Sequence, residues 1–380
     1  MTIETTSSTR VEGVDALRGL AALAVFVCHV GGYWGFLDLP GKVPQLVAAG
    51  AHGVDVFVVI SGFCLALPLA GHGRGLRVPA FYGRRAWRIL PPYYVALAIA
   101  AVLALVPATW HLTVARQASL SDVLLHLVTG QAWVPGEVGT INGSLWSVAL
   151  EVQLYLLFPL LVLAWRRWGI VPVLAGAVVL DLAWRSAGAL GGPAPIGSDL
   201  VLPARLDQFV AGMACAVVIR AGFTWSTRRS VVTFVVATLV ALGTSTLNLG
   251  VVTGVTWAAA GASAVLLLAG PVGRAMGGTT LERFGVRSFS FYLLHQPVLL
   301  VLAPVVAALP GGTPVRLVLG GSLALAITVL SSELLFRAVE MPSHRAGRRR
   351  FPTTVAPAPR LRLSADPSPE PEPEPEPTTV

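Results

Sequence analysis

The chain has 380 residues, of which 54% are hydrophobic and only 12% are charged, and its mean hydropathy is +0.72. Soluble domains carry about 25% charged residues, so this composition excludes a single water-soluble domain and indicates a polytopic membrane protein. The net charge of +8 would also suit a nucleic-acid-binding protein, so the placement of the basic residues has to decide between the two classes.

Ten apolar stretches are long enough to cross a bilayer, which takes about 17–25 helical residues. The sequence therefore predicts an all-α, polytopic membrane bundle of about ten transmembrane helices. The first apolar run is too long for the core of a cleavable signal peptide. The predicted spans are 17–37, 50–70, 89–108, 145–164, 169–188, 205–221, 231–248, 251–270, 288–308 and 315–337.

The basic residues alternate from one side of these spans to the other. With the N-terminus inside, all but five of the 27 basic residues fall on inner segments, and the exceptions are Lys42, Arg116, Arg185, Arg205 and Arg316. Cytoplasmic loops of membrane proteins carry such an excess. We therefore expect a multi-pass protein of the cell membrane with both termini in the cytoplasm and no nucleic-acid partner.

The first span holds two polar side chains that need a reason. Arg18 lies near its inner end and His29 lies eleven residues further on, which places both on one helix face about 16 Å apart. A histidine at mid-depth can accept a proton at neutral pH and act as a general base. The structural alternative is a neutral histidine that hydrogen-bonds to another helix.

The second and third spans add further candidates. Asp55 lies near the outer end of its span and Ser61 near mid-depth, and both have a structural reading as well as a substrate-binding one. Arg85 and Arg88 share a helix face in an arginine-rich inner segment. Guanidinium groups bind phosphate well, although these arginines could simply set the topology.

The fourth and ninth spans also carry polar groups. Glu151 lies below the outer surface with Tyr155 one turn deeper, and the carboxylate could orient an imidazole, hold a substrate hydroxyl or act structurally. His295 stands two residues before Pro297, so it could cap backbone that the proline leaves unpaired or line a substrate path. Other polar residues have bland readings: Asp207 as a partner of Arg205, Glu340 as structural and Cys28, Cys64 and Cys215 as packing residues without metal-binding spacing.

The chain divides into a membrane domain, residues 1–342, and a tail, residues 343–380, that is basic and then rich in Pro and Glu. Such a tail cannot bury apolar surface, so we expect a disordered cytoplasmic segment.

Taken together, these segments resemble the membrane acyltransferase 3 family over about residues 14–342. The elements that carry the resemblance keep the same order along the chain. They are Arg18 with His29, Gly53-Val54-Asp55-Val56-Phe57 leading to Ser61-Gly62-Phe63, Arg85-x-x-Arg88 before Pro91, Trp146-Ser147-x-x-x-Glu151-x-x-x-Tyr155, Tyr292-Leu293-Leu294-His295-Gln296-Pro297, and Glu340-x-Pro342.

The resemblance implies an enzyme that moves an acyl group, expected to be acetyl, from cytoplasmic acyl-CoA to a hydroxyl of a carbohydrate-containing acceptor. It implies His29 and Glu151 as catalytic residues and Arg18, Arg85 and Arg88 as donor-binding residues. It implies no permanently bound cofactor. The acceptor would be a surface polysaccharide or a glycosylated natural product such as a macrolide.

Many relatives carry a fused extracytoplasmic hydrolase-like domain, and the sequence has no segment of that kind. Direct transfer or a separate extracytoplasmic partner is therefore expected. The alternative function is that of a non-enzymatic exporter or an envelope-complex membrane protein.

Overall fold

The computed structural model describes residues 11, 13–71, 75–106, 116–223 and 225–352. Throughout these ranges the regular structure is helical, without a strand, and ten helical segments are long and apolar enough to span a membrane. The all-α bundle predicted from the sequence is thus confirmed. The ten segments are α1 (Val14–Tyr33), Lys42–Ala66 (α2 Lys42–Ala48, η1 Ala49–His52, α3 Gly53–Ala66), α4 (Val78–Leu105), α6 (Leu145–Trp168), α7 (Ile170–Ala189), η4–α8 (Leu202–Arg205, Leu206–Arg220), α9 (Thr227–Thr246), α10 (Gly250–Leu268), α13 (Ser288–Ala308) and Thr313–Arg350 (α14 Thr313–Leu335, η5 Phe336–Glu340, α15 Met341–Arg350).

Shorter helices connect these segments. They are α5 (Leu120–Leu127), η3 (Gln131–Trp133), α11 (Pro271–Met276) and α12 (Thr280–Val286). Helix α12 packs along α1, so the short connection before α13 contributes to the bundle rather than lying apart from it.

Three segments differ clearly from their predicted ranges, and the first of them is the second span, which runs from Lys42 to Ala66 rather than over 50–70. Helix α4 begins at Val78, well before residue 89, because Pro79 suits the first helical turn and the arginine-rich segment continues as helix. The last segment turns through a π-helix, η5, and stays helical to Arg350. Residues 343–350 are therefore helical rather than part of a disordered tail, and the rest of the predicted tail from 353 on lies outside the described residues.

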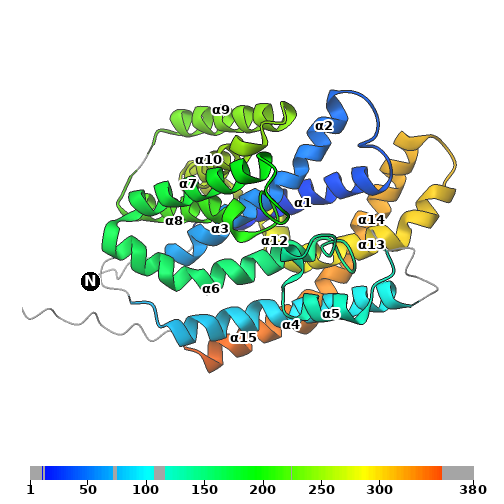
Figure 1. Cartoon of the computed structure of the whole chain (residues 1–380), viewed down its shortest axis with the longest axis horizontal. Helices are drawn as coiled ribbons and strands as arrows, with labels where there is room; N and C mark the ends of the chain where they lie inside the picture. The colour runs from blue at the N-terminus through cyan, green and yellow to red at the C-terminus, as the bar shows by residue number, and fades with distance from the viewer. Residues whose placement is uncertain (1–10, 12, 72–74, 107–115, 224, 353–380) are drawn as a thin grey trace, which may run out of the picture.

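Helix α3 forms the centre of the bundle, where it packs against α8, α1 and α10 (Figure 1). Glycines allow these close approaches. A Cβ atom at Gly62 would overlap the carbonyl oxygen of Phe209, and one at Gly212 would overlap that of Val59. Gly53 meets the carbonyl oxygen of Ala21 on α1 in the same way. Small residues at such crossings are how membrane helices gain contact area, since lipid offers no hydrophobic driving force.

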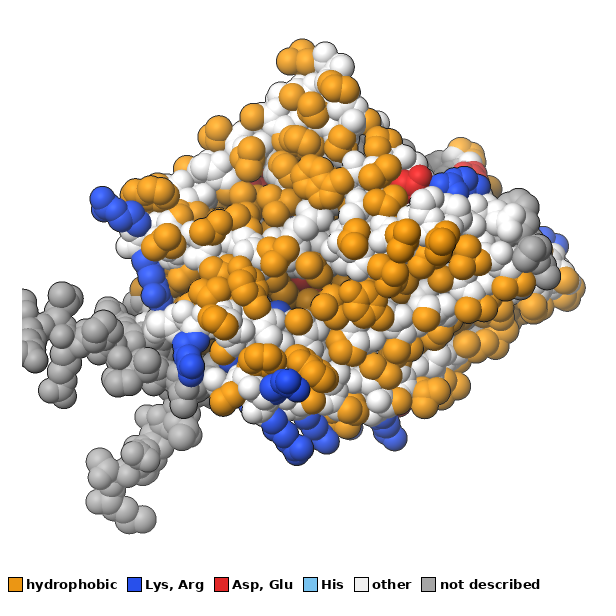
Figure 2. Space-filling view, turned by 60° about the horizontal axis from the view of Figure 1, so that its bottom comes forward, with side chains coloured by type: hydrophobic (Ala, Val, Ile, Leu, Met, Phe, Trp, Pro, Cys, Tyr) orange, Lys and Arg blue, Asp and Glu red, His pale blue; other side chains and the backbone are white. Residues whose placement is uncertain are grey.

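Helices α4 and α15 lie side by side along the lower edge of the bundle in Figure 1. Large apolar side chains cover much of the surface, among them Leu239 on α9 and Leu330 on α14, which are 62% and 72% exposed. Lys and Arg side chains gather at the left end and along the lower edge of the view in Figure 2. This distribution fits a lipid-facing belt with a basic end.

Candidate active site

A cavity of about 90 Å³ lies between α1, α3, α4, α6, α12, α13 and η5. A second cavity shares four of its lining residues, Arg18, Arg88, Val286 and Glu340, and continues toward Asp15 and His344. The polar residues of the first cavity are Arg18, Ser61, Arg88, Ser147, Glu151, Ser288, Tyr292 and Glu340.

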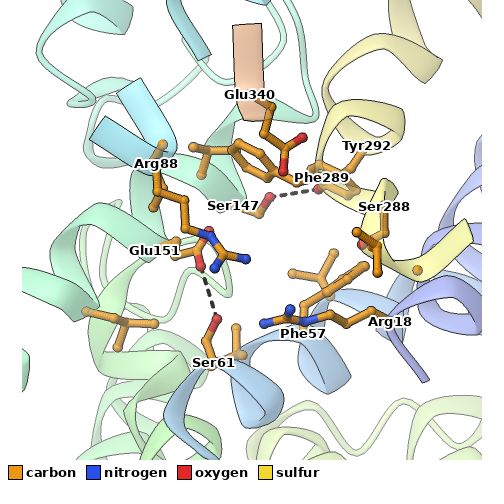
Figure 3. Close-up of a pocket in the computed structure, with 17 residues that line it drawn as sticks. Arg18, Phe57, Ser61, Arg88, Ser147, Glu151, Ser288, Phe289, Tyr292 and Glu340 are labelled. Atoms are coloured by element: carbon orange, nitrogen blue, oxygen red, sulfur yellow. Dashed lines mark hydrogen bonds between the residues drawn. The ribbon is translucent and has the colours of Figure 1, made fainter. Parts of the chain in front are cut away.

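Two guanidinium groups point into this cavity from different helices. Arg18 extends from α1 and Arg88 from α4, and their charged ends face the same space (Figure 3). Arg18 donates to Asp15 Oδ1 at 3.3 Å and to Cys64 Sγ at 3.8 Å. Two like charges that share a space repel each other, so a bound anion between them would be stabilised by both.

Glu151 forms the opposite wall. Its Oε1 atom accepts a hydrogen bond from Ser61 Oγ at 3.0 Å (Figure 3). It accepts another from the Tyr155 hydroxyl one turn along α6. Ser61 comes from α3, so the carboxylate links two helices. Both donors are hydroxyl groups, which leaves the second carboxylate oxygen available to a ligand.

Arg85 does not line the cavity. Its guanidinium group lies over the rings of Phe81 and Tyr155, with 5.8 Å and 5.4 Å from Cζ to the ring centroids. The side chain therefore supports the wall behind Glu151. The sequence predicts that Arg85 and Arg88 bind the acyl donor together. In the structure, Arg88 lines the cavity and Arg85 does not.

The two histidines of the first and ninth predicted spans meet. His29 Nδ1 lies 2.7 Å from His295 Nε2, and the ring planes are inclined by only 17° with their centroids 5.0 Å apart. His295 Nδ1 in turn lies 2.6 Å from the carbonyl oxygen of Tyr292, a cavity-lining residue. The pair therefore lies about one helical turn beyond the cavity wall along α13.

The expected contact between His29 and Glu151 is absent from the described hydrogen bonds. Each group has other partners: the imidazole pairs with His295, and the carboxylate pairs with Ser61 and Tyr155. These partners do not place Glu151 beside the imidazole of His29, so its substrate-binding and structural interpretations are the ones that fit the geometry.

Residues not anticipated from the sequence enclose the histidine pair. The ring of Tyr33 stacks on that of His29 at 5.7 Å, and its hydroxyl receives a hydrogen bond from Gln296. Gln296 Oε1 accepts from the backbone N–H of Ser144 at 2.5 Å. Gln296 could have been anticipated from the sequence, because it directly follows His295. Nothing in the sequence indicates that Ser144, which precedes the fourth span, packs against Gln296.

Asp55 lies away from the cavity in a buried polar cluster. It pairs with Arg205, lies 2.5 Å from His52 Nδ1 and accepts from Gln208 Nε2 at 2.8 Å. This arrangement gives Asp55 a structural role and does not place it at the substrate cavity. The expected Arg205–Asp207 pair is also wrong, since both carboxylate oxygens of Asp207 are without a hydrogen-bond partner among the described residues.

The outer segment holds an ion-pair cluster at the start of α5. Arg116 donates to both carboxylate oxygens of Asp122, at 2.8 and 3.0 Å. Burial favours the protonated form of Asp122, but hydrogen bonds from Arg116 and Ser119 outweigh it and hold the pKa of this carboxyl well below its usual range. The cluster fixes the helix start and offers no metal site, because no group of three or more His, Cys, Asp or Glu ligands occurs in the described ranges.

Comparison with known proteins identifies the chain's family. The model described as an acyltransferase domain, that of the acyltransferase 3 family, matches residues 11–333. The acyltransferase MdmB of Streptomyces mycarofaciens is 27% identical over 379 residues, which cover 92% of this chain and 95% of MdmB. No solved structure matches the chain.

Two further relatives match over about half of this chain. The peptidoglycan O-acetyltransferase OatA of Listeria monocytogenes is 25% identical over 189 residues, or 47% of this chain and 28% of OatA. Nodulation protein 10 of Rhizobium leguminosarum bv. viciae is 28% identical over 193 residues, or 47% of this chain and 50% of that protein. The chain therefore belongs to the acyltransferase 3 family and is a multi-pass membrane O-acyltransferase.

Proposed function

We propose that this enzyme transfers an acetyl group from acetyl-CoA to a hydroxyl of a carbohydrate-containing acceptor, with the basic end of the bundle in the cytoplasm. The observation that carries the proposal is the cavity between Arg18 and Arg88, whose guanidinium groups face one space (Figure 3). Planar guanidinium groups bind phosphate oxygens in pairs, and the donor brings several phosphates.

The excess of arginine at one end of the bundle supports the orientation. Cytoplasmic segments of membrane proteins are enriched in Lys and Arg, and acyl-CoA is a cytoplasmic metabolite. Arg18 lies near the inner end of α1, and His29 lies about 16 Å further along the same helix. A long, linear thioester arm can bridge that interval, so phosphates held at Arg18 and Arg88 leave the thioester near the histidine pair.

The reaction then needs a base beside the thioester carbonyl. His29 takes the proton of the acceptor hydroxyl while the hydroxyl oxygen bonds to the carbonyl carbon. The carbon–sulfur bond breaks, and the departing thiolate takes that proton back from His29. The products are the O-acyl ester and free CoA. Glu151, which keeps one carboxylate oxygen unused by Ser61 and Tyr155, is placed to hold a hydroxyl or amide of a substrate.

The proposed class of acceptor is based on the names of the relatives. OatA of Listeria is named as acting on peptidoglycan, whereas MdmB, which is matched over nearly its whole length, is named only as an acyltransferase. A hydroxyl on a carbohydrate is the acceptor we propose, either in a surface polymer or in a glycosylated natural product.

The test uses the full chain in lipid nanodiscs with labelled acetyl-CoA, and it follows free CoA and labelled product. Peptidoglycan fragments and a glycosylated macrolide serve as separate acceptors. We expect acceptor-dependent CoA release from wild type and from the control Arg229→Gln, which changes an exposed arginine at the start of α9. The double variant Arg18→Gln/Arg88→Gln should bind acetyl-CoA about 100-fold more weakly. Equal affinity in that variant and in the control would overturn the proposed donor site.

A further inference from the structure

The hydrogen bonds of the histidine pair have a fixed direction. The carbonyl oxygen of Tyr292 can only accept, so the Nδ1 atom of His295, 2.6 Å away, carries a proton and donates it. In an uncharged His295 the Nε2 atom is then the acceptor. It lies 2.7 Å from His29 Nδ1, which must therefore be the donor. Only this arrangement satisfies both hydrogen bonds in the uncharged pair.

We propose that His295 is a positioning residue that sets the tautomer of His29, leaving the Nε2 atom of His29 unprotonated and ready to accept a proton. The inference deepens the proposed function, because it names the group that prepares the base. After proton uptake at Nε2, the Nδ1–H bond to His295 stays in place and is strengthened by the charge on His29. The arrangement does for this base what a buried carboxylate does for other catalytic histidines.

The surroundings of the two rings fit a role of His29 as the base and of His295 as the residue that positions it. His29 keeps part of its surface accessible, whereas His295 is only 1% exposed. His295 is held on its other side by the backbone of its own helix, and Tyr33 stacks on His29. Of the two rings, His29 is therefore the one with exposed surface.

The proline kink gives no competing explanation for His295. Pro297 lacks an N–H group, which leaves the carbonyl of Leu293 without its helical partner. That carbonyl accepts a hydrogen bond from Asn142 Nδ2 at 3.2 Å. Since Asn142 satisfies the unpaired backbone group, the ring of His295 is not needed there and is available to His29.

The experiment reads the tautomer directly. Full-length protein labelled with ¹⁵N-histidine is studied in bilayers by solid-state NMR near neutral pH, and the His29 signals are assigned by their loss in His29→Gln. We expect a protonated Nδ1 and an unprotonated Nε2 in wild type. His295→Phe removes the acceptor, and the proton should move to Nε2. His295→Asn offers an amide oxygen to His29 and an amide N–H to Tyr292, so it should restore the wild-type tautomer.

A protonated Nε2 in uncharged wild-type His29, or the same tautomer in His295→Phe, would overturn the inference. This readout needs no turnover, so it stands even if the proposed donor or acceptor is wrong. In the transfer assay we expect His295→Phe to lower kcat by about 100-fold with an unchanged KM for acetyl-CoA, and His295→Asn to recover most of that loss.

The matched control is His126→Phe. His126 is also fully buried and also hydrogen-bonds a backbone carbonyl through Nδ1, at 2.8 Å, but it lies on α5 outside the site. It should leave both the His29 tautomer and kcat unchanged. An equal loss of kcat in His126→Phe and His295→Phe would assign the effect to general loss of structure and contradict a positioning role.

Discussion

The cavity and the histidine pair are built in different ways. The cavity is lined by four charged side chains, Arg18, Arg88, Glu151 and Glu340, and adjoins a second cavity toward the basic end. The histidine pair is joined by hydrogen bonds of fixed direction. The two arginine side chains of the open wall attract an anionic ligand, and salt weakens that attraction. A closed network instead fixes where a proton goes, which is a matter of geometry. In the function proposed above, substrate capture and proton transfer are thus separated along α1.

The largest expected effect comes from His29→Gln. Loss of the base should lower kcat by about 1,000-fold, whereas the Kd of acetyl-CoA should stay within about twofold, because Arg18 lies at the other end of α1 and Arg88 lies on α4. Initial rates and calorimetric titration measure the two quantities. A parallel fall in rate and affinity would contradict the separation of the two regions.

Asp55→Asn tests a residue that belongs to neither region. The change leaves buried Arg205 without its counter-charge, which costs about 3–5 kcal/mol of stability. Thermal unfolding in nanodiscs should register this loss, and Asp55→Asn/Arg205→Gln should recover part of it. Unchanged stability together with weakened acceptor or donor binding would instead assign Asp55 to a substrate site.

Lysine substitutions at Arg88 and Arg85 test which of the two arginines contacts the donor. Arg88→Lys replaces a bidentate donor by a point charge and should weaken acetyl-CoA binding about 10-fold. Arg85→Lys should leave this affinity unchanged but lower stability by about 1–2 kcal/mol, because the guanidinium group lies over Phe81 and Tyr155. Titrations at two salt concentrations measure the first effect. Equal losses of affinity would place both arginines at the donor.

The smallest expected effect is that of Asp122→Asn, which distinguishes the pH dependence of protein stability from the pH dependence of acyl transfer. Because the folded-state pKa of Asp122 is held below its unfolded value, its ion pair with Arg116 contributes stability at neutral pH that is lost below about pH 5. Asp122→Asn should therefore flatten the acid limb of the unfolding temperature against pH. The pH profile of transfer should stay as in wild type, since the cluster touches neither region. A shifted transfer profile would link them.

The membrane spans could be predicted because their signals are local. Apolar length and the alternation of arginine along the chain each depend on a few consecutive residues. The start of α4 at Val78 was missed because helix continues through charged residues, such as Arg84, where the apolar count stops. Helix α15, which follows Glu340, is not predicted either, because it too is rich in charged residues.

The site was only partly predictable. Arg18, Ser61, Arg88 and Glu151 stood out as polar groups in apolar stretches, and the structure places all four at one cavity. Their partners depend on which helices are neighbours, and periodicity carries no information on that. Glu151 was the expected partner of His29, yet α1 packs along α13, which brings His295 to it instead.

The glycine contacts within the bundle have a mechanical consequence for the donor. Gly53, Gly62 and Gly212 fasten α1, α3 and α8 into one body that cannot slide without backbone overlap. Gly347 is pressed against Trp87 in the same way, so α4 and α15 form another. Arg18 belongs to the first body and Arg88 to the second. An anion bound by both would tie the two bodies together, so acetyl-CoA should raise the unfolding temperature of the enzyme, and the rise should grow with the logarithm of its concentration above the Kd.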